Sequence, residues 1–231
     1  MRPGAKTIAS SLRLATEFNS IVQWNILFYK DFIISHLVDE AIRWTSAALL
    51  PSRSAVDIIQ SITHNWIRLY GPMRLLVSDQ ESGIMGDACN LWLDRQQIQV
   101  KTKEPGTHAH IVERHHDLLR RVLHTTEAQL AEEGVDMPFE VTLAECTLAK
   151  NVMLSVAGFS PYQALCGRLP QMMANFEPSS DVQLVDDVSG IIGASRHHHR
   201  VREIALASMV EMIAKQRIER AAKTQTRRSI E

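Results

Sequence analysis

The feature that most constrains the fold is a short apolar run that ends in a carboxylate. The run Leu75–Ser78 is followed directly by Asp79, and Glu113 comes 34 positions later. A buried strand of this kind delivers the next residue to the carboxyl edge of a sheet, where open α/β sheets place their ligands. The Pro105–Gly106 turn puts Glu113 in the opening turns of a long predicted helix. Each residue alone also fits a structural role, Asp79 as a turn former or helix cap and Glu113 as a partner of the helix dipole. Together they predict two carboxylates that converge from different elements.

The stretch before this run predicts a meander of three antiparallel strands. β-Branched and aromatic residues occur in three short bursts, separated by polar turns at Lys30-Asp31 and Asp39-Glu40-Ala41. The bursts cover Ile21–Tyr29, Phe32–Val38 and Trp44–Leu50. This part of the chain therefore predicts one half of a sheet.

The remaining pattern alternates helices with two further strands. Helical spacing of apolar residues covers Ala55–Tyr70, the region around Cys89–Leu93, Ala109–Glu133 and Pro138–Ser155, and a strand is predicted over Ile98–Thr102. In the long helix, one set of positions is predicted to face the core: Leu118, Leu119, Val122, Leu123, Thr126 and Leu130. The four tryptophans are also predicted to lie in the core. The pattern by itself predicts an α/β fold.

Composition excludes several classes of protein. With 231 residues, 45% hydrophobic and 22% charged, the chain is that of a globular protein with one sizeable core and an appendage. A net charge of −1 gives no global field for a polyanion, so any nucleic-acid contact must come from local patches. Cys89, Cys146 and Cys166 are far apart, which argues against disulfides and against a thiolate zinc site. No apolar run approaches the roughly 20 residues of a membrane span. We expect a nuclear or cytoplasmic protein without a membrane partner.

The ends of the chain are predicted to lie outside the core domain. Residues 1–17 are interpreted as a linker, 18–170 as the core, 171–194 as a connector and 195–231 as a basic helical extension. From residue 196 onward there are nine Lys or Arg against four Glu. The apolar positions of this extension are Val201, Ile204, Ala205, Met209, Met212 and Ile213. They favour a helix that packs on the core or on a partner, with a phosphate-contacting role allowed for its last ten residues. The run His197-His198-His199 is interpreted neither as a tag nor as a metal site.

Five motifs, taken in order, resemble the catalytic core of integrases from retroviruses and long-terminal-repeat retrotransposons. They are Val38–Trp44, Trp66–Pro72, Ser78–Gln80, His108–His116 and Ser160–Pro170, and the resemblance runs roughly from Ala15 to Lys223. It implies a ribonuclease-H-like five-stranded mixed sheet flanked by helices, here with a C-terminal helical extension. It also implies DNA integration by phosphoryl transfer, with Mg²⁺ or Mn²⁺ held by an Asp, Asp, Glu (DDE) set. DNA and further copies of the chain are the implied partners.

The resemblance also exposes a departure from the family pattern. Asp79 and Glu113 match the second and third acidic residues, but the first position falls on Asn25. An amide is neutral and cannot readily bridge two cations, so metal binding and turnover are expected to be weakened. Asp31 and Asp39 are expected to lie too far away to replace it.

Several basic residues near this site are candidates for DNA contact. Arg120 lies two turns beyond Glu113, and Lys101 and Lys103 flank the Pro-Gly loop. His115 or His116 could support Glu113 or a water, but a histidine pair at a helix start usually faces solvent, and this is the expectation for both.

Two functions stay open on the sequence. The first is an integrase-like core that binds and joins DNA ends, impaired by Asn25. The second is a non-catalytic DNA-binding or protein-interaction module derived from a retrotransposon integrase. Whether the chain is an enzyme is therefore left open, and a general nuclease is less favoured because the flanking motifs match integrases.

Overall fold

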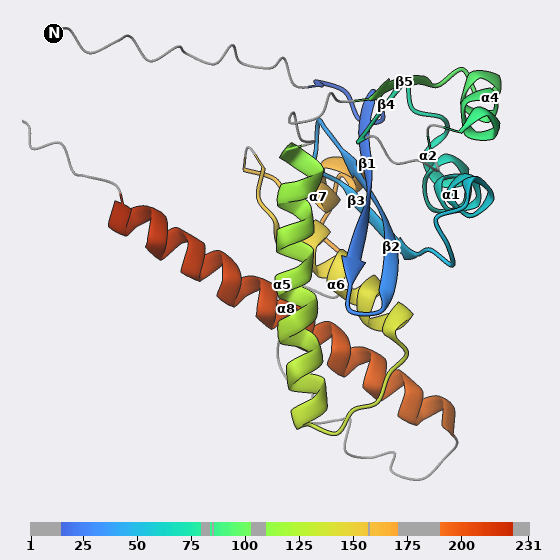
Figure 1. The fold of residues 1–231 in the computed structure, drawn as a ribbon. Helices are drawn as coiled ribbons and strands as arrows, with labels where there is room; N and C mark the ends of the chain where they lie inside the picture. Colours follow the sequence, from blue (N-terminus) through green and yellow to red (C-terminus); the bar gives the residue numbers. More distant parts are fainter. Residues whose placement is uncertain are drawn as a thin grey trace, which may run out of the picture.

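The chain folds around a five-stranded sheet with helices on both faces (Figure 1). The structure, a computed structural model, describes residues 15–79, 84, 86–102, 110–156, 158–170 and 190–223. The strand order across the sheet is β3-β2-β1-β4-β5. The strands are β1 (Ile21–Tyr29), β2 (Phe32–Asp39), β3 (Thr45–Leu49), β4 (Leu75–Ser78) and β5 (Gln99–Thr102).

The first three strands form the predicted meander. β1 pairs antiparallel with β2, and β2 pairs antiparallel with β3. β4 then lies parallel to β1, and β5 parallel to β4. The mixed sheet implied by the resemblance is therefore confirmed.

Helices occupy the segments between and after the strands. They are α1 (Ala55–Ile62), η1 (Thr63–Ile67), α2 (Arg68–Tyr70), α4 (Asp87–Arg95), α5 (His110–Glu132), α6 (Phe139–Met153), α7 (Pro161–Cys166) and α8 (Gly190–Lys223). The helix predicted over Ala55–Tyr70 is present, with a π-helical turn, η1, in its middle. The short helix α7 has a capping box, in which Ser160 and Gln163 bond each other's backbone N–H.

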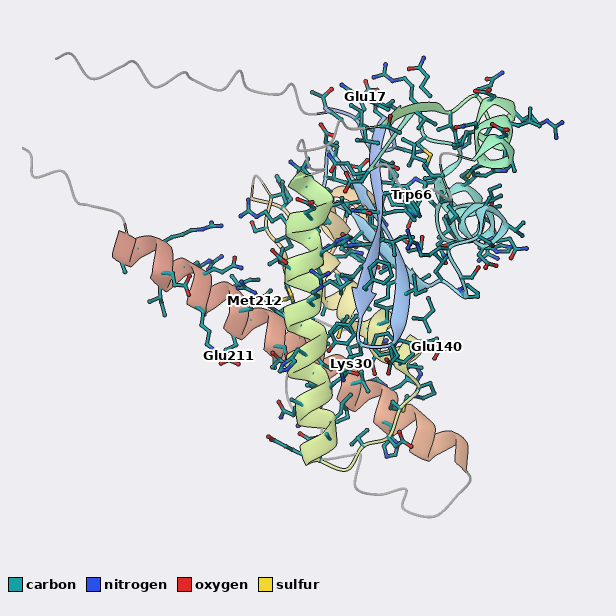
Figure 2. All side chains as sticks on the ribbon, in the orientation of Figure 1. Glu17, Lys30, Trp66, Glu140, Glu211 and Met212 are labelled. Atoms are coloured by element: carbon teal, nitrogen blue, oxygen red, sulfur yellow. The ribbon has the colours of Figure 1, made fainter. Side chains whose placement is uncertain are left out.

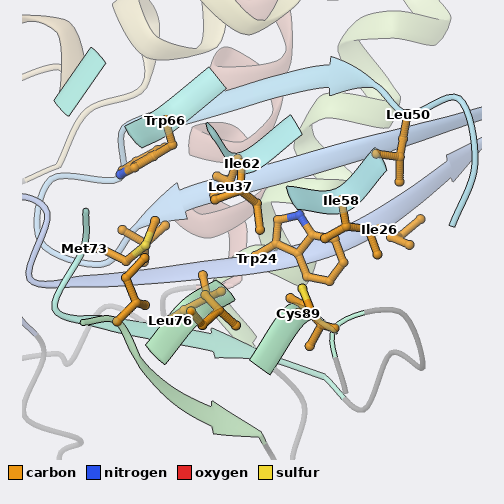
Figure 3. Close-up of a cluster of buried hydrophobic side chains, with 14 residues drawn as sticks. Trp24, Ile26, Leu37, Leu50, Ile58, Ile62, Trp66, Met73, Leu76 and Cys89 are labelled. Carbon is orange, nitrogen blue, oxygen red and sulfur yellow. The ribbon is translucent and has the colours of Figure 1, made fainter. Parts of the chain in front are cut away.

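One face of the sheet packs an apolar core against α1, η1 and α4. Trp24, Leu37 and Leu76 of the sheet meet Ile62 and Trp66 of the helices, and all five are fully buried. Figure 3 shows these side chains gathered on one side of the strands. Trp66 appears on this side of the sheet in Figure 2 as well.

The opposite face packs against α5 and α6, with α8 laid across both helices (Figure 1). Leu27 and Ile34 of the sheet contact Leu119 of α5, Cys146 of α6 and Met209 of α8 in a second core. Two arginines of α8 tie the helix to this layer: Arg200 bonds Glu133, and Arg202 bonds Glu145 through both carboxylate oxygens. The apolar stripe predicted for the C-terminal helix thus packs on the core. The helix begins at Gly190, before the predicted start of the extension.

The predicted inward face of α5 is confirmed, and one expectation about this helix is wrong. Leu119, Val122 and Leu123 are buried as predicted. His115 and His116, expected to face solvent, are only 4% and 5% exposed. They lie one turn before Leu119 on the same stripe of the helix, so the packing of α5 on the sheet buries them.

Candidate functional site

The centre of the candidate site is a contact between β1 and the residue that follows β4. Trp24 pairs with Ser78 across the parallel strands, so the next residues, Asn25 and Asp79, come side by side. The Nδ2 group of Asn25 donates a hydrogen bond to Oδ2 of Asp79 at 2.9 Å. Both residues are half-buried. The structure brings together the two residues aligned with the first two acidic positions; their catalytic role stays a prediction.

The orientation of the Asn25 amide is fixed from both sides. Its Oδ1 atom accepts a hydrogen bond from the N–H of Ile26 at 2.8 Å, while its Nδ2 faces the Asp79 carboxylate. A flipped amide would place NH₂ against that N–H and oxygen against the carboxylate, losing both bonds. The side-chain oxygen of Asn25, its one side-chain atom able to ligate a cation, therefore already accepts a backbone hydrogen bond.

The third candidate, Glu113, stands in the first turn of α5, which lies over β1. The N–H of the preceding residue, Val112, donates to Oε1 of Gln23 at 3.2 Å. Gln23 lies two residues before Asn25 in β1, so both side chains point to the α5 side of the sheet. Glu113 is half-buried. Gln23 was not identified from the sequence, although strand alternation placed it on the same face as Asn25.

A divalent ion is the group that the resemblance implies for this site. Asp79 and Glu113 offer the anionic oxygens that Mg²⁺ prefers, but Asn25 does not fit the position of a bridging ligand. Among the residues that the structure describes, no group of three or more His, Cys, Asp or Glu side chains is arranged to hold a metal ion. The site as built does not fit a bridged two-ion centre.

Asp39 and Asp31, the two aspartates considered as replacements for Asn25, lie at the end of β2 and in the turn before it. Asp39 is fully buried at the end of β2, where its carboxylate accepts from the N–H of Asn19 at 2.9 Å and of Ile42 at 2.8 Å. Burial raises the pKa of Asp39, and these backbone bonds oppose the shift. Asp31 is exposed in the turn between β1 and β2. Both observations agree with the expectation from the sequence.

A buried group of basic side chains lies behind the site, and sequence analysis did not find it. His36 is the register partner of Asn25 on β2, and its ring stacks on that of His116 with centroids 4.9 Å apart. Lys150 of α6 is fully buried and donates to Oγ1 of Thr45. Both ring nitrogens of His36, and Nε2 of His116, have no hydrogen-bond partner among the described residues. A signal existed for Lys150, which lies four residues after Cys146 on the inward face of α6.

Burial and neighbouring groups lower the pKa values of these basic side chains. Burial, with the nearby Lys150 amine, lowers the pKa of His36 and of His115 well below the usual value for histidine. Burial and the charge of Arg120 lower the pKa of His116 to about 3. Burial likewise lowers the pKa of the Lys150 amine. The three histidines behind the site are therefore neutral at pH 7, and burial disfavours the charged form of Lys150.

Two of the three predicted DNA-contacting residues, Arg120 and Lys101, lie within the described part of the chain. Arg120 is exposed on α5, where its guanidinium is 3.6 Å from the carboxylate of Asp117. Lys101 is exposed on β5 and pairs in register with Val77, which pairs with Gln23. Lys101 therefore lies on the sheet face that also carries Asn25. Lys103 lies outside the described residues. The role of these side chains in binding DNA stays a prediction.

Comparison with known proteins supports the fold and goes no further. No protein-family model matches the sequence, and no curated protein matches it. Among solved structures, the HTLV-2 integrase catalytic core domain in complex with magnesium, in its dimeric form, matches with a TM-score of 0.54 at 15% identity, over 63% of this chain and 95% of that one.

Two further solved structures agree. A chain of the simian T-cell lymphotropic virus intasome, solved in complex with the PP2A regulatory subunit B56 gamma, matches with a TM-score of 0.61 at 18% identity, over 82% of this chain and 65% of that one. The catalytic core domain of BIV integrase matches with a TM-score of 0.50 at 19% identity, over 64% of this chain and 95% of that one. The chain therefore has the ribonuclease-H-like fold of retroviral integrase catalytic cores.

Proposed function

We propose that this chain is an integrase-like core that binds DNA and whose metal-dependent DNA strand transfer is impaired at its first acidic position. The hydrogen bond from Asn25 to Asp79 carries this proposal. Where two carboxylates would repel each other and attract cations, an amide and a carboxylate satisfy each other at 2.9 Å. The pair is stable without an ion.

The consequence for metal binding follows from charge. Replacing Asp by Asn removes one of three anionic charges from a site that must hold two divalent cations. Asp79 and Glu113 are left to bind Mg²⁺ or Mn²⁺, and we expect that binding to be weak. The chemistry that the ions supply in such sites is activation of the attacking oxygen and stabilisation of the leaving one.

DNA is the proposed partner because two of the elements that carry the candidate site, or lie next to it in the sheet, also carry exposed basic side chains. Arg120 of α5 and Lys101 of β5 are exposed, and each offers a charge to phosphate.

Self-association is proposed by analogy with HTLV-2 integrase cores, which are described in dimeric and trimeric forms. No described helix is long and apolar enough to cross a membrane.

The same hydrogen bond favours a second candidate function, a DNA-binding or protein-interaction module without catalysis. Asn25 uses both polar atoms within the protein, one on Asp79 and one on Ile26. A site satisfied in this way needs no ion to hold its fold. The two functions differ in one property, turnover on DNA.

The deciding experiment measures nicking and strand joining on branched DNA with Mg²⁺ and with Mn²⁺. The native chain, Asn25→Asp, Asp79→Asn and the exposed control Asp94→Asn are compared, with DNA binding measured for each by fluorescence anisotropy. We expect all four to bind DNA and Asn25→Asp to exceed the native rate by about tenfold or more, equivalent to about 1.4 kcal/mol of transition-state stabilisation. If the native chain already cleaves and only Asp79→Asn abolishes cleavage, Asn25 is tolerated and the chain is a working enzyme. If Asn25→Asp binds DNA but gains no activity, the non-catalytic function is the better account.

A further inference from the structure

Gln23 joins three elements of the structure at one buried point. Its side chain is 3% exposed on β1, on the face that carries Asn25. Its Oε1 atom accepts from the N–H of Val112 at 3.2 Å, and its Nε2 donates to Oε2 of Glu40 at 3.1 Å. The strand, the start of α5 and the turn after β2 are therefore linked through one amide.

The bond to Val112 supplies an acceptor that a helix start needs. The first N–H groups of a helix have no partner within it, and a nearby side chain usually caps them. Here the acceptor for Val112 comes from a strand 89 positions away in sequence. Val112 immediately precedes Glu113, so this bond sets where the Glu113 backbone stands relative to β1.

Glu40 determines which way the Gln23 amide points. The Glu40 carboxylate can only accept, so it selects the NH₂ end of Gln23 and leaves the oxygen for Val112. Glu40 is itself held firmly: its N–H donates to the carbonyl of Ile21 at 2.9 Å, and its carbonyl accepts from Nη1 of Arg43 at 2.6 Å. Glu40 is only 9% exposed. The orientation of the Gln23 amide is thus built into the fold.

We infer that Gln23 is a positioning residue for the candidate site, which fixes the start of α5, and with it Glu113, over the strand that carries Asn25. Glu40 acts through Gln23 by holding its amide in the one orientation that can accept from Val112. The inference rests on the proposed function only in taking Glu113 as a site residue. The contact itself does not depend on catalysis.

The test uses variants that remove and then restore this contact. Gln23→Met keeps the length of the side chain and removes the acceptor, and Gln23→Glu keeps an acceptor but sets two carboxylates against each other. The exchange Gln23→Glu with Glu40→Gln restores both bonds, because the amide introduced at position 40 can donate to the carboxylate introduced at position 23 while that carboxylate still accepts from Val112. Gln99→Met, on the exposed part of β5, is the matched control.

Two readouts separate positioning from stability. The first is hydrogen exchange of the Val112 amide in the native background, and the second is Mn²⁺ affinity in the Asn25→Asp background, with melting temperature recorded throughout. We expect Gln23→Met to remove the protection of Val112 and to weaken Mn²⁺ binding by about tenfold or more, as loss of a ligand-orienting residue does. The paired exchange is expected to restore both, and Gln99→Met to change neither.

The outcomes distinguish this inference from the proposed function. If Asn25→Asp binds no Mn²⁺, the proposed function fails, and exchange at Val112 still decides the role of Gln23 in holding the start of α5. If Gln23→Met leaves Val112 protected, the inference is overturned. If Val112 loses protection but Mn²⁺ affinity is unchanged, or if the paired exchange restores neither readout, Gln23 is a packing residue only and the inference is overturned as well.

Discussion

The two faces of the sheet are built differently, although the same strands make both. On the α1 side, β1 contributes Val22, Trp24 and Ile26, which pack in the apolar core (Figure 3). On the α5 side, the alternate residues are Gln23, Asn25 and then Leu27. The buried apolar residues that β1 contributes to that face are Leu27 and Tyr29. The α1 face thus contributes apolar packing, and the α5 face combines apolar packing with polar contacts around the candidate site.

Buried basic side chains also lie on the polar half of the α5 face, the part of that face around Gln23 and Asn25. His36 and Lys150 are fully buried, and the charged or titratable groups that influence His36 most are Lys150, His116 and His115. Buried nitrogen atoms without a partner cost stability, on the order of 1 to 3 kcal/mol each. Natural sequences tend to retain such costs near functional sites. The apolar packing on the α1 side therefore offsets the stability that these unpartnered nitrogens cost on the α5 side.

The largest effect is expected from breaking the apolar face. Trp24→Ala removes a fully buried indole and should lower the free energy of unfolding by about 3 to 5 kcal/mol. The hydroxyl of Ser35, which accepts from the indole N–H at 2.9 Å, would also lose its partner. Urea unfolding checks this, with Leu91→Ala, 55% exposed on α4, as the control expected to change stability by less than about 0.5 kcal/mol. A loss below about 1 kcal/mol for Trp24→Ala would show that this face does not dominate stability.

Much of this division could be predicted from sequence, because alternation along a strand is a local property. The residues of β1, the carboxylate after β4 and the inward leucines of α5 were all placed correctly. The histidines were not, although His115 and His116 continue the Leu119 stripe by one helical turn. Because their side chains are polar, we expected them to face solvent, although their spacing places them on the buried stripe. How far along a helix burial extends is determined by tertiary packing. The contact between Gln23 and Val112 joins residues 89 apart, and no local pattern could reveal it.

Lowering the pH is expected to reduce the stability of the fold through the buried histidines of the α5 face. The pKa of His116 is about 3 in the folded chain, against about 6.5 when unfolded. Between these values the unfolded chain binds the extra proton, so stability is complete above about pH 6.5 and falls as the pH drops. The pKa of His36 is lowered in the same direction. At about 1.4 kcal/mol per pH unit, one such histidine removes about 2 kcal/mol at pH 5.

The measurement is urea unfolding of the native chain and of His36→Phe from pH 7 to pH 5. Phenylalanine keeps a ring to stack on His116 and carries no proton to bind. We expect the native chain to lose more stability than His36→Phe over this range, because His36 binds its proton only in the unfolded chain. His124→Phe, at an exposed position of α5, is the control and should follow the native chain. Parallel pH profiles for all three chains would rule out the buried His36 as a source of acid lability.

A smaller effect on the free energy of unfolding, a gain instead of a loss, is expected from replacing a buried polar side chain of the α5 face with an apolar one. Lys150 is fully buried, and burial lowers the pKa of its amine, so the folded chain binds this proton less tightly than the unfolded chain does. That difference reduces stability at neutral pH and vanishes as the pH rises toward the unfolded pKa of about 10.4. Lys150→Met keeps the apolar stem and removes the titration, at the loss of the bond to Thr45. We therefore expect a gain of about 1 kcal/mol at pH 7.

The sign of this effect is best tested through its pH dependence. Urea unfolding at pH 7 and at pH 9.5 should show the native chain gaining stability relative to Lys150→Met at the higher pH. Lys215→Met, an exposed lysine of α8 that is 2.8 Å from Glu211, is the matched control and should show no gain at pH 7. If Lys150→Met is less stable than the native chain at both pH values, the bond to Thr45 outweighs the cost of the buried amine. The polar half of the α5 face would then stabilise the fold in its own right, and the contrast between the two faces would be one of chemistry without a difference in stability.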